Sequence, residues 1–164
     1  MDALVPGGWT DFAVAAAGAT AALAGLTIVT ISVNVRQILA SPALVPRSAV
    51  TIAGFVVALL SSLALLVPQT LTAVGIEVLL VTAGALVIEV RAARADLRQR
   101  PARPRSEAVG HAALAAGWIV PFAVAGVLLT VALSAGLFVL ALGIGAAVVA
   151  SIVNTWVLLI EILR

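Results

Sequence analysis

The sequence predicts an all-α integral membrane protein, a bundle of five transmembrane helices, and two observations carry this prediction. First, 63% of the 164 residues are hydrophobic and only 10% are charged, a composition outside the range of soluble globular domains. Second, the apolar runs are long enough, as helices, to cross a hydrocarbon core of about 30 Å. Because the connections between the runs are short, we expect one domain over residues 1–164.

The expected helices are separated by prolines, small residues and one hydrophilic stretch. Pro68 ends the second helix, and Ser134 to Gly136 divide an apolar run that is too long for a single span. Residues 96–107 are charged and rich in proline, which predicts a basic cytoplasmic loop. Pro121 is expected to kink the fourth helix. The helices are therefore predicted at about residues 9–39, 48–67, 71–95, 109–133 and 137–163.

The basic residues predict how the helices cross the membrane. The chain has nine arginines and no lysine, and the arginines flank alternate connections: Arg36, Arg47, Arg91, Arg94, Arg98, Arg100, Arg103, Arg105 and Arg164. By the positive-inside rule, this alternation fits five spans with the N-terminus outside and the C-terminus in the cytoplasm. Four spans would break the alternation. Arginine without lysine, together with abundant alanine, valine and glycine, favours the plasma membrane of a bacterium.

The first helix carries two different surfaces. At about 100° per residue, one face holds Thr20, Thr27, Thr30, Asn34 and Gln37, and the nearly opposite face holds Gly18, Ala21, Gly25, Ser32 and Arg36. Small residues let helix backbones approach closely, and hydroxyls and amides hydrogen-bond between helices. We therefore expect this helix to be central in the bundle or to share one face with a partner. Gly143 and Ala147 form a similar stripe on the last helix.

Glu77 marks a candidate polar site inside the membrane. It lies about two turns into the third helix, roughly 10 Å from its outer end. Ser61, Ser62 and Thr20 are expected at a similar depth, so the four side chains predict a small polar pocket. Ionisable residues within spans are costly and mark functional sites by default. The alternative is a structural carboxyl that hydrogen-bonds to a hydroxyl or a backbone carbonyl.

A second polar cluster is predicted near the cytoplasmic side. Its members are Asn34, Arg36, Glu89, Asn154 and Glu161. The expected contacts are an ion pair of Arg36 with Glu161 or Glu89, and a contact between Asn34 and Asn154. Such contacts join helices in many membrane bundles. The alternative is a vestibule that binds a ligand or an ion.

The basic loop and the missing motifs narrow the function classes. Anionic lipid headgroups are expected near Arg98, Arg100, Arg103 and Arg105. Because the arginines flank helices, the excess of basic residues does not point to nucleic acid.

The single histidine, His111, and the lack of cysteine predict neither a metal site nor a cofactor. Phosphate-binding glycine loops, HExxH and nucleophile elbows are missing, so we expect a protein that is not an enzyme.

Two segments resemble a known group of proteins. The matching residues lie in the first helix and in the last one: Gly18, Ala21, Ala22, Gly25, Leu26, Ser32, Asn34, Asn154, Trp156 and Glu161. On these positions the chain is similar to small multi-span bacterial membrane proteins, chiefly actinobacterial. These proteins are uncharacterised in function and are loosely labelled modulators of the membrane protease FtsH. The resemblance implies a helical membrane protein and carries over no catalytic residues.

These features lead to one expected function and two alternatives. We expect a non-enzymatic membrane protein that acts through helix packing, as an accessory or regulatory subunit of another membrane protein or as a homo-oligomer. The first alternative is an oligomeric ion channel or small-solute transporter, with Glu77 and the Asn34, Asn154 and Glu161 cluster lining the path. The second is an accessory subunit that binds lipid or quinone, suggested by the basic loop and the tryptophans.

Overall fold

The computed structural model describes residues 4–41, 44–99 and 105–162, with the backbone alone at 99, 105–116 and 161–162. A short 3₁₀ helix, η1 (Gly7–Trp9), precedes α1 (Thr10–Val33), α2 (Val35–Ala40), α3 (Leu44–Ala64), α4 (Leu71–Gln99), α5 (Arg105–Thr130) and α6 (Ala135–Ile162). The prediction of a helical fold is confirmed for the described residues. Within the described parts of the chain, four helices are long and apolar enough to cross a membrane: α1 with η1, α3, α4 and α6. The described apolar part of α5, Gly117–Thr130, is shorter.

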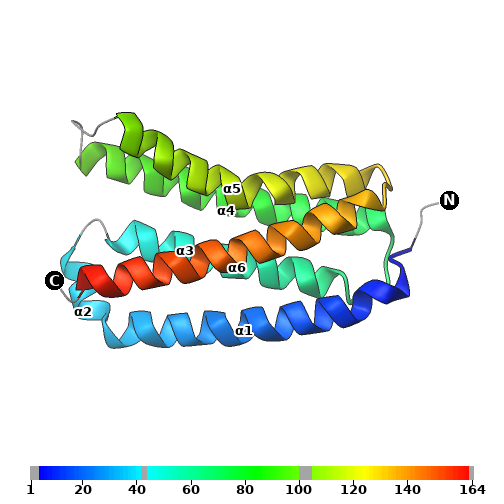
Figure 1. Cartoon of the computed structure of the whole chain (residues 1–164), viewed down its shortest axis with the longest axis horizontal. Coiled ribbons are helices and arrows are strands. Elements are labelled where there is room, and N and C mark those ends of the chain that lie inside the picture. The colour runs from blue at the N-terminus through cyan, green and yellow to red at the C-terminus, as the bar shows by residue number, and fades with distance from the viewer. Residues whose placement is uncertain (1–3, 42–43, 100–104, 163–164) are drawn as a thin grey trace.

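Four of the helices form a closed ring, and the first helix lies outside it. Each of α3, α4 and α5 packs against the next helix, and α6 closes the ring against α3. α1 packs mainly on α3 (Figure 1). In that view α1 runs along one side of the bundle, and α4 and α5 run along the other. The first helix is therefore peripheral in the single chain, not central.

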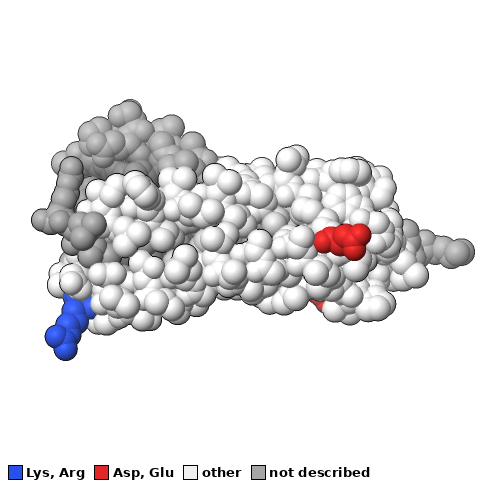
Figure 2. Space-filling view, turned by 60° about the horizontal axis from the view of Figure 1, so that its bottom comes forward, with Lys and Arg blue, Asp and Glu red and all other residues white. Residues whose placement is uncertain are grey.

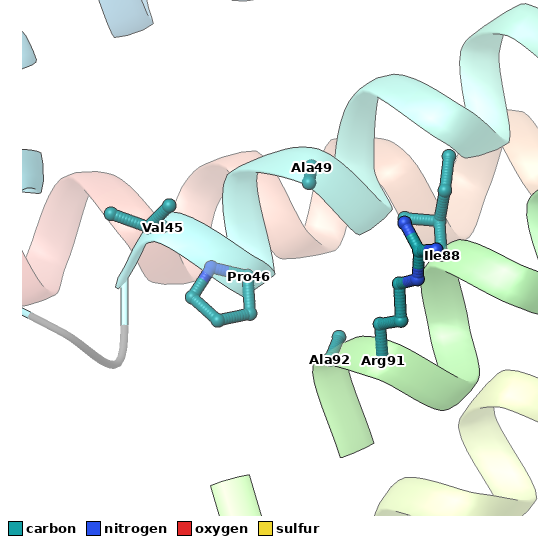
Figure 3. A pocket seen from close by; sticks show the side chains of 6 residues that line it. All are labelled: Val45, Pro46, Ala49, Ile88, Arg91 and Ala92. Atoms are coloured by element: carbon teal, nitrogen blue, oxygen red, sulfur yellow. The ribbon is translucent and has the colours of Figure 1, made fainter. Parts of the chain in front are cut away.

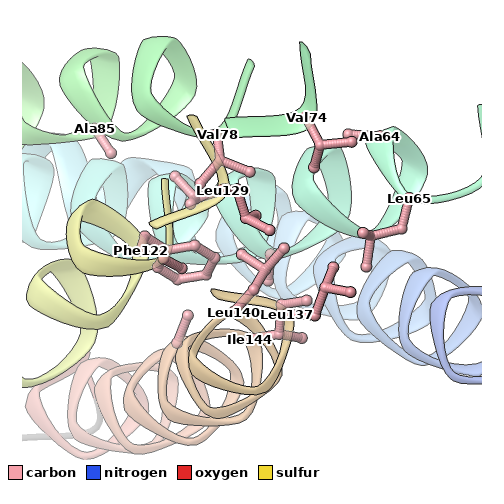
Figure 4. Close-up of a cluster of buried hydrophobic side chains, with 14 of the residues drawn as sticks. Ala64, Leu65, Val74, Val78, Ala85, Phe122, Leu129, Leu137, Leu140 and Ile144 are labelled. Atoms are coloured by element: carbon pink, nitrogen blue, oxygen red, sulfur yellow. The ribbon is translucent and has the colours of Figure 1, made fainter. Parts of the chain in front are cut away.

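The interior of the ring is filled by large apolar side chains. Val78 of α4, Phe122 and Leu129 of α5, and Leu140 of α6 are all essentially inaccessible, and they meet in one cluster (Figure 4). Ala64 and Leu65 join this cluster from the end of α3. Close packing of this kind supplies the dispersion contacts that hold helices together where water is absent.

Glycines allow the ring helices to approach closely. A Cβ atom added at Gly75 of α4 would lie 2.5 Å from the backbone nitrogen of Thr130 and 2.8 Å from the carbonyl oxygen of Gly126, both in α5. At the same crossing, the hydroxyl of Thr72 donates to the Thr130 carbonyl at 3.3 Å. Such distances leave no room for a side chain, so the α4–α5 contact depends on glycine at position 75.

The predicted first helix is interrupted at Asn34, which separates α1 from α2. Asn34 has φ −103° and ψ 15°, and its Nδ2 donates to the Thr30 carbonyl at 2.9 Å. The expectation of one helix over 9–39 is therefore wrong at this position. Asparagine side chains compete with the helical backbone for hydrogen bonds, and this one shares the Thr30 carbonyl with the Asn34 amide, which donates to it at 3.3 Å.

Three other helix ends extend beyond their predicted positions. α3 begins at Leu44, so Pro46 lies in the first helical turn, where its missing N–H group has no helical partner to lose. α4 continues to Gln99 and α5 begins at Arg105, so much of the predicted loop at 96–107 is helical. Arginine, leucine and glutamine favour helices, and here that preference outweighs the effect of high charge.

The turn between α5 and α6 lies slightly before the predicted break. Ala132 has φ 59°, and the amide of Leu133 donates to the Leu128 carbonyl at 2.9 Å. This is the Schellman pattern that ends many helices, with alanine at the position that usually carries glycine. α6 then begins at Ala135, so Gly136 lies within the helix.

Candidate functional site

α1 packs through one face and leaves the opposite face uncovered. Its packed side includes Thr20 and Thr27, which are 1% and 4% exposed. The hydroxyl oxygens of Thr27 and Thr155 of α6 lie 3.5 Å apart, which links α1 to the ring. The two predicted surfaces of α1 therefore have different roles within one chain, because only the side that carries the threonines contacts the other helices.

The uncovered side carries the small residues singled out in the sequence. Gly18, Ala21, Ala22 and Gly25 are all exposed, and a Cβ atom added at either glycine would meet nothing within 4 Å. We call these four residues the α1 outer face. Gly18 and Ala22 are four residues apart, as are Ala21 and Gly25, which gives two overlapping pairs of the small-xxx-small spacing that joins transmembrane helices.

The small residues of α6 are, by contrast, used within the chain. A Cβ atom added at Gly143 would lie 3.3 Å from the Pro121 Cβ atom and 3.4 Å from the ring of Phe122. Ala147 is fully buried. These two residues therefore pack α6 against its neighbours, and they are not available to a partner protein.

Glu77 lies on the exposed surface of α4. Its Oε2 atom accepts a hydrogen bond of 2.9 Å from Nε2 of Gln69, in the turn between α3 and α4. Ser61, Ser62 and Thr20 are at most 1% exposed, so the structure does not join them with Glu77 in the predicted pocket. The reason is the rotation of α4, which turns position 77 away from the bundle while Val74 and Val78 face inwards.

The two serines have different surroundings inside the bundle. The hydroxyl of Ser62 donates to the Ala58 carbonyl at 2.8 Å, within α3. The Ser61 Oγ atom is buried and has no hydrogen-bond partner. Thr51 and Thr82 donate to the carbonyls four residues before them, like Ser62. Most of these buried hydroxyls thus serve their own helices and do not build a shared polar site.

The predicted cytoplasmic-side cluster is not assembled among the described side chains. Asn34 bonds to its own helix through Thr30, and Arg36 is exposed on α2. The buried Oε2 atom of Glu89 has no hydrogen-bond partner, and the side chains of Arg36 and Glu89 form no ion pair. Asn154 is half-buried on α6. The Glu161 side chain lies outside the described residues, so the Arg36–Glu161 pair remains a prediction.

On the face of the bundle that includes α1, charged side chains lie near the two ends. Figure 2 brings the α1 side forward and shows a broad uncharged surface between a basic group at the α2 end and acidic residues towards the opposite end. Arg98 is exposed in the last turn of α4. Arg100 and Arg103, like the side chain of Arg105, lie outside the described residues. An uncharged band of this kind fits a lipid-facing surface.

One end of the bundle contains a groove that the sequence did not reveal. It has a volume of about 310 Å³ and lies between α3 and α4 (Figure 3). Its walls are Val45, Pro46 and Ala49 of α3, and Ile88, Arg91 and Ala92 of α4. The sequence offered one signal of this groove, the position of Arg91 within an apolar helix. That Arg91 lines a groove, however, follows only from the packing of α3 against α4.

Among the described residues, no group of three His, Cys, Asp or Glu side chains lies close enough together to hold a metal ion. The geometry instead offers two surfaces, the α1 outer face and the groove beside Arg91. We compared the chain with protein-family models, curated proteins and solved structures. None of these comparisons found a match.

Proposed function

We propose that this protein is a non-enzymatic integral membrane protein that acts by lateral helix packing through the α1 outer face. The observation that carries the proposal is the exposure of Gly18, Ala21, Ala22 and Gly25 on a helix that already packs on α3 through its other side. In lipid, helices associate through close backbone contact, because apolar burial alone gives no advantage over lipid tails. The occupant is a transmembrane helix, either of a second copy or of another membrane protein.

The proposal includes five spans in a bacterial plasma membrane, with the N-terminus outside and the C-terminus in the cytoplasm. The arginine pattern supports this orientation. An antiparallel bridge between Leu4 and Thr70 also supports it, because the bridge holds the N-terminal segment beside the α3–α4 turn. α5 has 26 residues, which is enough to cross about 30 Å of hydrocarbon.

Cysteine labelling tests the spans and the orientation, because the sequence contains no cysteine and each variant has a single reactive site. Ser134→Cys, in the α5–α6 turn, is expected to react with a membrane-impermeant maleimide in intact cells. Arg98→Cys and Arg36→Cys are expected to react only after the membrane is opened. If Ser134→Cys and Arg98→Cys behave alike, α5 does not separate them and the five-span arrangement is wrong.

Association is tested first with the unmodified protein. Extraction into lipid-retaining particles, followed by mass measurement, is expected to give a species heavier than the 16.5 kDa chain, as a homo-oligomer or with a co-purifying protein. In membranes, Ala22→Cys is expected to form a disulfide with a second copy that also carries the substitution. Ala83→Cys, exposed on α4, serves as the matched control.

The outcomes separate the two kinds of partner. A homo-oligomer with cross-linking at position 22 alone assigns the α1 outer face to a second copy. A reproducible second protein assigns the face to a different partner and makes this chain an accessory subunit. A monomeric particle, with no more cross-linking at position 22 than at position 83, contradicts the proposal.

A further inference from the structure

We propose that the groove between α3 and α4 binds an anionic phospholipid, with an acyl chain along its apolar walls and the phosphate at Arg91. This site is separate from the α1 outer face and does not depend on what that face binds. Val45 and Ile88 line the groove and are 41% and 38% exposed, so a lipid chain has access to both. A volume of about 310 Å³ falls within the range of about 300–1,000 Å³ that is typical of ligand pockets.

The lining of the groove combines apolar walls with a single charged group. Of the six lining residues, only Arg91 is charged, and Figure 3 shows its side chain extending beside Ile88. Within the described residues, the Arg91 guanidinium forms no ion pair. A guanidinium at the edge of an apolar surface attracts the anionic head groups of lipids. A ligand that complements this groove is therefore an amphiphile with an anionic head.

The two arginines that follow Arg91 along α4 favour a phosphate as the anionic head group of the ligand. Arg91, Arg94 and Arg98 are spaced by three and four residues, which places them within about 60° on one side of the helix. All three are exposed. Guanidinium groups bind phosphate oxygens through paired, charge-assisted hydrogen bonds. The three side chains therefore form a basic track that starts at the groove and leads towards the end of the helix.

The experiment measures lipid retention by native mass spectrometry of the purified protein in neutral detergent. Phosphatidylglycerol and phosphatidylcholine with identical acyl chains are added in turn, and glycerol phosphate is added as a head without chains. The unmodified protein is expected to retain phosphatidylglycerol in preference to the other two. Arg91→Gln is expected to weaken this retention about tenfold, the order expected for the loss of a hydrogen bond between charged groups. Ala49→Phe, which fills the groove, is expected to have a similar effect.

Two matched variants distinguish lipid binding in the groove from a general attraction of the lipid to the protein surface. Arg36→Gln removes an exposed arginine of α2 outside the groove, and Ala93→Phe adds a ring to an exposed position of α4 that does not line it. Both are expected to retain phosphatidylglycerol like the unmodified protein. Thermal unfolding of each variant shows whether it is folded. Equal losses for Arg36→Gln and Arg91→Gln, or for Ala93→Phe and Ala49→Phe, overturn the proposal, as does equal retention of phosphatidylcholine.

Discussion

Replacing Gly75 with leucine is expected to destabilise the folded bundle by about 3 kcal/mol or more, at the upper end of the cost of overpacked cores. The new Cβ atom would lie 2.5 Å from the backbone nitrogen of Thr130, and backbone atoms cannot move aside as a flexible side chain can. α4 and α5 would have to separate, and the hydrogen bond from Thr72 to Thr130 would be lost with the contact. In thermal unfolding, this corresponds to a midpoint lowered by about 6–12 °C.

Gly84 of the same helix provides the control. A Cβ atom added there would meet nothing within 4 Å, so Gly84→Leu is expected to fold like the unmodified protein. Gly75→Ala isolates the cause, because it adds only the Cβ atom and improves the intrinsic helix propensity by about 1 kcal/mol. We expect it to destabilise the protein despite that gain. If Gly75→Leu and Gly84→Leu unfold at the same temperature, the close α4–α5 crossing is wrong.

The double variant Gly18→Leu, Gly25→Leu is expected to weaken association about thirtyfold and to leave the single chain folded. Nothing in the chain lies within 4 Å of a Cβ atom at either position, so the bundle has room for both leucines. A partner backbone, however, would be held away by them. Loss of a central contact of about 2 kcal/mol raises the dissociation constant about thirtyfold. The measurement is the oligomer fraction in lipid-retaining particles as the protein is diluted, with thermal unfolding as the test of folding.

Gly145→Leu is the matched control for this double variant. Gly145 is also exposed, on α6, and a Cβ atom there would meet nothing within 4 Å. We expect Gly145→Leu to associate normally. Association that survives in the double variant, or that is lost equally in Gly145→Leu, contradicts a specific role for the α1 outer face.

The sequence predicted the helical fold and the order of its long apolar segments, because segment length and apolar composition decide those features. Pro68, for example, lies in the turn where α3 has ended, as expected. The interruption at Asn34 was not predicted, because apolar residues continue on both sides and one asparagine does not ordinarily end a helix. Its side-chain bond to Thr30 is a three-dimensional detail that composition does not reveal.

The rotation of each helix was hard to predict from the sequence. Whether Glu77 faces the core or the surface depends on which side of α4 is covered by α3 and α5. The same difficulty applies to glycine: Gly18 and Gly143 have similar sequence patterns, yet one is exposed and the other contacts Pro121. Gly75 was not predicted to be a packing residue. A glycine within a long apolar helix is nevertheless a signal of close helix packing, because glycine is unfavourable there without a packing reason.

The closed ring of α3 to α6, with α1 outside it, has a consequence for the order in which the chain assembles during synthesis. α1 leaves the ribosome first, and its main partner α3 is the next long helix, so these two can pair early. α3, however, also needs α6, which is made last. Until α6 arrives, the ring is open and the side of α3 around Gly54 is unfilled, because Gly54 meets Ser151 of α6. The last helix therefore completes the core, and folding ends with the α3–α6 contact, which closes the ring across two intervening helices.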